Sequence, residues 1–193
     1  MKSAIRYAAP YAVLAVVLIA FGGCASTPNT ISNADPAADF SRYRTFGFFD
    51  PMATDEAGYE SLVTSFLKVA MSQELARRGL AYAEDPDLKV NFFINTKEKI
   101  RSHSVPSLSA YYDYRDPFFY DPWPAYPAYE TRIEQYTEGT LNIDVVDPKT
   151  KKLVWEGVAS GRITDSDIRN LEKTIDDAVK AVMVNFPIAV SQP

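Results

Sequence analysis

The chain has 193 residues, of which 47% are hydrophobic and 23% are charged, and this composition fits one globular domain and excludes disorder throughout. Its 20 basic and 25 acidic residues give a net charge of -5 with no visible basic patch, which argues against nucleic-acid binding. One cysteine excludes an internal disulfide, and one histidine excludes a His-rich metal site. No Walker, dinucleotide or zinc spacing occurs, so neither a cofactor nor a metal is expected.

The N-terminus is typical of a secretory leader. Lys2 and Arg6 precede an uninterrupted apolar run at 12–21, and a Phe-Gly-Gly-Cys sequence ending at Cys24 resembles a bacterial lipobox. We expect residues 1–23 to be a lipoprotein signal peptide and Cys24 to carry acyl chains such as palmitate that anchor the protein in a membrane. The alternative is an unmodified cysteine in an ordinary signal peptide.

The residues after Cys24 suggest a location and a linker. The residue after Cys24 is Ala25 and not aspartate, which resembles the enterobacterial sorting pattern for the outer membrane. A periplasm-facing outer-membrane lipoprotein is therefore expected. Residues 24–38 are interpreted as a flexible tether. A single α/β domain is predicted over residues 39–188.

The first half of this domain predicts a strand, a helix and a second strand. An aromatic and β-branched run at 44–49 indicates a strand, and Gly79 is placed to end a helix over 58–78. Residues 88–95 alternate as a half-buried strand does. The apolar positions expected in the core are Tyr59, Leu62, Val63, Phe66, Val69 and Ala70 of the helix and Leu88, Val90, Phe92 and Ile94 of the strand.

The second half predicts a β-hairpin followed by a helix. Residues 136–146 and 153–159 are the two strands, and 147–152 supply the turn. Asp165 or Ser166 is able to cap the final helix, and Pro187 ends it. Its apolar stripe is Ile168, Leu171, Ile175, Ala178, Val179, Val182, Met183 and Phe186.

The resulting order, strand-helix-strand-strand-strand-helix, places the chain in the α+β class. It suggests a two-layer α/β sandwich with a small, largely antiparallel sheet and both helices on one face. The first two strands are expected to be parallel, because a helix connects them.

An aromatic, Pro/Tyr-rich loop is predicted at 101–131, where four prolines exclude a regular central strand or helix. It either covers an open part of the sheet or contacts a partner protein, a cell-wall glycan or lipid headgroups. The candidate binding residues are Tyr111, Tyr112, Tyr114, Phe118, Phe119, Tyr120, Trp123 and Tyr126.

Catalysis has little support in the sequence. His103 is the only histidine and lies in the predicted loop, without a rigid frame for a triad. Asp85 and Asp87 suit turns and caps better than a calcium site or an acid pair. We therefore expect no enzyme. The alternative is a cell-wall-directed hydrolase that uses the acids of the aromatic loop, Asp113, Asp116 and Asp121.

Short motifs lie in order at 39–46, 78–80, 85–90, 138–147, 152–157 and 185–187. Together they resemble the bacterial lipoproteins of the domain of unknown function 4136. The resemblance implies an envelope lipoprotein of α/β fold with no established reaction, so no catalytic residue is carried over. The expected function is that of a binding or envelope-assembly module, with an envelope protein or a cell-wall glycan as partner and no nucleic acid.

Overall fold

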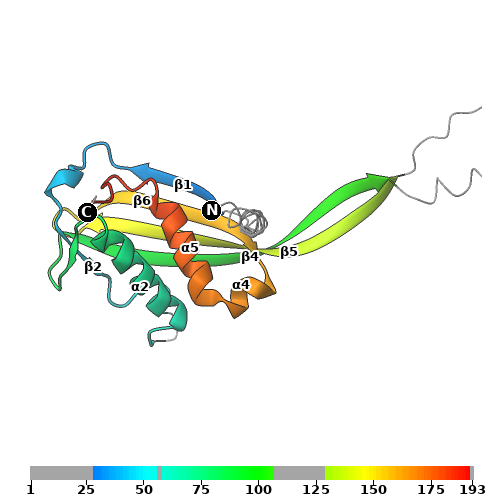
Figure 1. The fold of residues 1–193 in the computed structure, drawn as a ribbon, viewed down its shortest axis with the longest axis horizontal. Helices are drawn as coiled ribbons and strands as arrows, with labels where there is room; N and C mark the ends of the chain where they lie inside the picture. Colours follow the sequence, from blue (N-terminus) through cyan, green and yellow to red (C-terminus); the bar gives the residue numbers. More distant parts are fainter. Residues whose placement is uncertain (1–27, 56–57, 107–128, 192–193) are drawn as a thin grey trace, which may run out of the picture.

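The computed structural model of the protein describes residues 28–55, 58–106 and 129–191. Its centre is a six-stranded mixed sheet in the order β1-β6-β5-β4-β2-β3 (Figure 1). The strands are β1 (Asn29–Ala34), β2 (Thr45–Phe48), β3 (Ala81–Tyr82), β4 (Leu88–Pro106), β5 (Tyr129–Asp147) and β6 (Lys152–Ile163). The helices are the short 3-10 helix η1 (Phe40–Arg42), α2 (Leu62–Ala76), α4 (Asp165–Arg169) and α5 (Leu171–Met183).

The predicted fold class was wrong about the sheet. The sheet is larger than the small one expected, it is mixed, and its strand order differs, because β1 and β3 join it at opposite edges. β1 lies within the predicted tether at 24–38 and pairs antiparallel with β6, from Asn29–Ser160 to Ala34–Trp155. Its sequence, NTISNA, is mostly polar because an edge strand needs few core residues, and so its periodicity gave no signal.

The predicted parallel pairing of the first two strands is confirmed. β2 lies parallel to β4, with Phe46 opposite Leu88, and α2 forms the connection. β4 pairs antiparallel with β5, β5 with β6, and β6 with β1. The hairpin of β5 and β6 is also confirmed, with Asp147 opposite Lys152 at the turn.

α2 and α5 lie over one face of the sheet and enclose the core (Figure 1). The buried face of α2 differs in part from the predicted one. Leu62 and Val69 are exposed, and Tyr59 is exposed and precedes the helix, whereas Ala70 is buried and Val63 and Phe66 pack against the core. Apolar residues occur around most of this helix, so the sequence spacing allowed more than one phase, and packing selected another. The buried residues of α2 are Thr64, Leu67, Ala70, Met71, Glu74 and Leu75.

The single final helix of the prediction is two helices, α4 and α5. Asn170 separates them with a non-helical backbone (φ -116°, ψ 43°). Neither Asp165 nor Ser166 caps the first of them; Thr164 does, in a capping box with Asp167. Ile168 is therefore exposed on α4, whereas Val179 and Met183 of α5 are fully buried.

β4 and β5 are much longer than predicted. They include residues 101–106 and 129–131 of the predicted loop, while residues 107–128 lie outside the described residues. Leu88, Val90 and Phe92 are buried as expected, but Ile94 is 45% exposed. β4 and β5 continue past the helices as a narrow extension away from the body of the domain (Figure 1).

Candidate functional site

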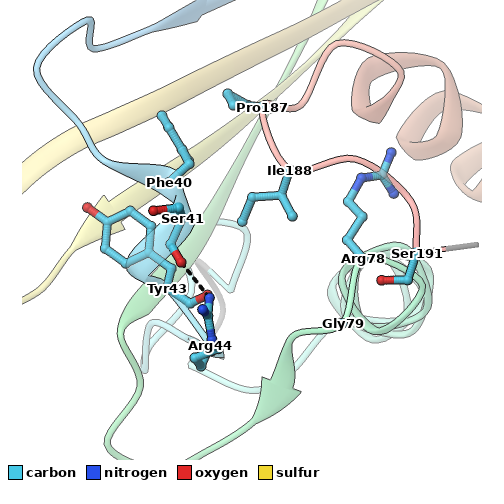
Figure 2. Close-up of a pocket in the computed structure, with 9 residues that line it drawn as sticks. All are labelled: Phe40, Ser41, Tyr43, Arg44, Arg78, Gly79, Pro187, Ile188 and Ser191. Atoms are coloured by element: carbon cyan, nitrogen blue, oxygen red, sulfur yellow. Dashed lines mark hydrogen bonds between the residues drawn. The ribbon is translucent and has the colours of Figure 1, made fainter.

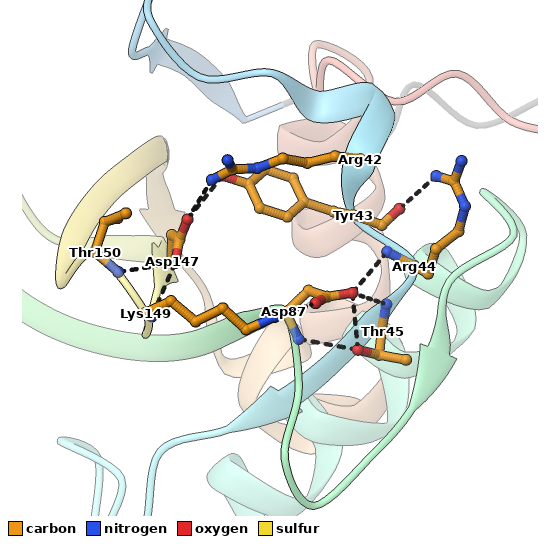
Figure 3. A network of polar contacts seen from close by, with 8 residues as sticks. All are labelled: Arg42, Tyr43, Arg44, Thr45, Asp87, Asp147, Lys149 and Thr150. Carbon is orange, nitrogen blue, oxygen red and sulfur yellow. Dashed lines mark hydrogen bonds and ion pairs between the residues drawn. The ribbon is translucent and has the colours of Figure 1, made fainter.

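A polar network joins the β5–β6 turn to the segment before β2 (Figure 3). The Asp147 carboxylate, only 2% exposed, accepts hydrogen bonds from Arg42 Nη2 at 2.6 Å and from the Tyr43 hydroxyl at 3.3 Å. The backbone N–H groups of Lys149 and Thr150 also donate to it. Burial by itself would raise the pKa of Asp147, but these hydrogen bonds and the Arg42 charge lower it.

Asp87 forms the second half of this network. Its carboxylate accepts hydrogen bonds from Lys149 Nζ at 2.9 Å, from the Arg44 N–H at 3.1 Å and from the Thr45 N–H and hydroxyl. The hydrogen bond from Lys149, followed by that from Arg44, lowers the pKa of Asp87 to about 2. Such a carboxylate is ionised near neutral pH and is a poor general acid.

These residues line a cavity of about 250 Å³. Each of its two carboxylates is already paired with a cation, Asp147 with Arg42 and Asp87 with Lys149. The network therefore holds the β5–β6 turn against the sheet. The lining of this cavity contains no pair of carboxyl groups of which one is protonated, as a glycosidase requires.

A larger groove, of about 440 Å³, lies between η1 and the C-terminal segment (Figure 2). Arg44 Nη1 donates to the carbonyl oxygens of Ser41 and Tyr43, and buried Arg78 donates to Glu74 and to the Met183 carbonyl. The guanidinium groups of Arg44 and Arg78 are thus already bound to backbone carbonyls and to the Glu74 carboxylate. Its lining comprises Phe40, Ser41, Tyr43, Arg44, Arg78, Gly79, Pro187, Ile188 and Ser191, a set without a carboxylate.

The extension of β4 and β5, here named the ribbon, is the most exposed part of the described fold. It comprises the pairs from Lys99–Tyr136 to Pro106–Tyr129. β6 pairs with β5 only as far as Thr137, and β2 pairs with β4 only at 88–90, so within the described residues no third strand flanks the ribbon.

The two faces of the ribbon differ in chemistry, because side chains alternate along paired strands. One face, named the uncharged face, carries two exposed isoleucines: Ile100 is 73% exposed and Ile133 is 69% exposed. Its members are Ile100, Ser102, Ser104, Tyr129, Thr131, Ile133 and Gln135. The opposite, charged face carries Lys99, Arg101, His103, Glu130, Arg132 and Glu134, with Val105 and Tyr136.

The family model for the domain of unknown function DUF4136 matches residues 30–188. The chain belongs to this family. That match covers most of the sequence and confirms the family that the motifs indicated.

The similar solved structures show the fold alone. A PDZ domain protein from Parabacteroides distasonis is 14% identical with a TM-score of 0.53, over 84% of this chain and 36% of that one. The DUF4136 chain thus spans about a third of that protein. A PelC dodecamer from Paraburkholderia phytofirmans is 8% identical with a TM-score of 0.38, over 81% of this chain and 97% of that one. No curated protein sequence matches the chain significantly.

Most residues predicted as functional in this DUF4136 protein lie outside the described residues: Cys24, Asp113, Asp116, Asp121 and the eight aromatic residues from Tyr111 to Tyr126. His103 lies on the charged face, with Nε2 3.6 Å from a Glu134 oxygen. In the described ranges, no three His, Cys, Asp or Glu side chains gather closely enough to hold a metal. No described helix has the length and apolarity to cross a membrane.

The sequence interpretation missed the ribbon, although a signal for it was present. Cations alternate with other residues at Lys97, Lys99 and Arg101, and Ile100 falls between two of them. This is the period-2 pattern of a strand. Because of the prolines in the predicted loop, its start was placed at residue 101, although β4 continues to Pro106.

Proposed function

We propose that this chain is a lipid-anchored, periplasm-facing lipoprotein of the outer membrane that acts as a binding or envelope-assembly module and has no catalytic role. The observation that carries the binding role is the ribbon. Its partner would be an envelope component, either a protein or the cell-wall glycan. The lipid attachment rests on the leader and on Cys24 in the sequence.

The physical state of the ribbon supports a contact role. A two-stranded hairpin is at best marginally stable in water, because it buries little apolar surface. This one leaves both outer strand edges unpaired among the described residues and exposes Ile100, Ile133 and Tyr129. Such edges and side chains are the features by which partners add strands or dock on a sheet.

The state of Asp87 and Asp147 supports a non-catalytic role for the cavity that they line. Asp87 and Asp147 both have lowered pKa values and are held by cations and backbone N–H groups. A hydrolase needs one carboxyl whose pKa is raised so that it can donate a proton. The cavity that these two residues line offers no such group.

The lipid anchor is tested by Cys24→Ser. Because Cys24 is the only thiol, the variant is expected to lose all metabolic labelling with fatty acid and to leave the membrane fraction. Ser26→Cys in the same background is the control and is expected to stay unlabelled. Membrane association that survives Cys24→Ser would contradict the anchor.

The contact role is tested by photocrosslinking in cells. A photoreactive residue at Arg101 or Arg132, both on the charged face of the ribbon, is expected to give a defined adduct. The same residue at Val69, which is exposed on α2, is expected to give none. The contact role fails if the ribbon positions react no more than Val69.

A further inference from the structure

The chain enters the sheet beside the ribbon. In register, Asn29 lies opposite Ser160, Ser160 opposite Thr140, and Thr140 opposite Asn95, so these four residues form one row across the sheet. Pro28, the residue before β1, lies against Gly161 of β6. β1 therefore begins at the end of the sheet from which the ribbon extends.

The connection to Cys24 is short because β1 begins within the predicted tether, at Asn29. Cys24 precedes Pro28 by four residues, which span at most about 14 Å when extended. The body of the sheet between Leu88 and Asn95 is about 23 Å long, so this connection cannot reach past it. A membrane that holds Cys24 thus lies on the ribbon's side, and the ribbon cannot point directly away from it.

The ribbon is also longer than the connection. From Lys99 to Pro106, β4 advances about 23 Å, which exceeds the reach of residues 24–28. A membrane that holds Cys24 therefore lies close enough to the start of β1 for the ribbon to run along its surface. A short linker also holds the ribbon and the lipid surface at high effective concentration.

The faces of the ribbon suit this position. The uncharged face combines Ile100 and Ile133, which are diagonal neighbours across the strands, with Tyr129 and with serine and threonine hydroxyls. Tyrosine is favoured at the boundary between headgroups and acyl chains. The charges lie on the opposite face, where Glu138 pairs with Lys99 and Glu134 with Arg162. Amphipathic elements with this division lie in membrane interfaces.

We propose that the ribbon lies on the membrane that carries the anchor, with its uncharged face among the lipid headgroups and its charged face in water. This inference rests on the proposed lipidation of Cys24. It assigns the lipid surface as the occupant of the uncharged face and leaves the charged face to a soluble or envelope partner.

The test places one fluorescent probe on each face. Thr131→Cys and Arg132→Cys are neighbours on β5 and lie on opposite faces. Each full-length lipidated variant is labelled at the new thiol, because lipidation blocks Cys24. The proteins are reconstituted into phosphatidylethanolamine and phosphatidylglycerol vesicles that contain nitroxide-labelled lipid. The probe at Thr131 is expected to shift to shorter wavelength and to be quenched severalfold more than the probe at Arg132.

Equal and weak quenching at both positions overturns the inference. A wavelength shift at Thr131 that persists in detergent and grows with protein concentration also overturns it, and assigns the face to a second copy of the chain. Fatty-acid labelling of the same preparations separates the two proposals. Labelled protein without quenching leaves the anchor intact and refutes the ribbon contact, whereas absence of label refutes both.

Discussion

Gly157 shows how closely the core is packed at the scale of one residue. A Cβ atom at this position of β6 would overlap the Trp155 ring and Val182 of α5. Trp155 and Val182 are each only 1% exposed, so neither side chain has room to move aside. We expect Gly157→Ala to lower the free energy of unfolding by about 1–3 kcal/mol in urea titrations.

The control is Gly161→Ala on the same strand. There the added Cβ would meet only Pro28, at 3.8 Å, which is ordinary contact. This variant is expected to unfold within about 0.5 kcal/mol of the unchanged protein. Similar losses in both variants would show that the strand rejects any side chain, and that the clash with Trp155 is irrelevant.

Asp87 predicts a pH dependence of stability. Its pKa in the folded chain is about 2, below the value of about 3.9 in an unfolded chain, so the ionised form favours folding. The contribution is complete above the unfolded pKa and is lost as the pH falls toward the folded one. Asp87→Asn should therefore be less stable than the unchanged protein by a constant amount above about pH 5.

The difference should shrink between about pH 4 and pH 2, as measured by urea midpoints across this range. Asp85→Asn is the matched control, since Asp85 lies two residues away in the same turn. A difference between Asp87→Asn and the unchanged protein that stays constant down to about pH 2 would refute the role of this carboxylate.

At the scale of the element, β5 is one strand with two environments. Ile143 is fully buried under the helices, whereas Ile133 on the same side of the strand is mostly exposed on the ribbon. Ile143→Ala should cost about 2–5 kcal/mol of unfolding free energy, because it removes buried methyl groups and leaves a cavity. Ile133→Ala should cost less than about 0.5 kcal/mol, because its side chain is already 69% exposed.

Urea unfolding of the two variants compares the same substitution on one strand. A loss at Ile133 that equals the loss at Ile143 would mean that the ribbon folds into the core of the domain. The same comparison explains why Ile94 did not behave as predicted. Alternation assigns a residue to a face of the sheet, but the extent of the covering helices decides whether that face is buried there.

At the scale of the whole molecule, the body of the domain is expected to fold without the ribbon. Among the residues that the structure describes, none of the buried core residues lies between residues 99 and 136. Joining Glu98 to Thr137, which are paired, by an Asn-Gly turn should keep a cooperative thermal transition, since this dipeptide favours two-residue hairpin turns. Circular dichroism on heating measures this. Loss of the cooperative transition would place the ribbon or its connection in the core.

The sequence by itself determined the family, the hairpin of β5 and β6, the parallel pairing of β2 and β4, and the existence of helices near 62–76 and 171–183. These features depend on local periodicity, turn residues and short motifs. The leader and Cys24 are likewise a property of the sequence, and their role remains a proposal with its own test.

The tertiary structure alone decided which residues form the candidate surface. β1 is polar and short, and only its pairing with β6 makes it a strand. Asp87 and Asp147 are distant in the sequence, and Lys149 and Arg42 bring them into one network through long-range contacts. Ile100 and Ile133 become neighbours only because β4 and β5 pair in one register. A strand's local pattern says which side chains share a face, but its partners determine how far it extends and what covers it.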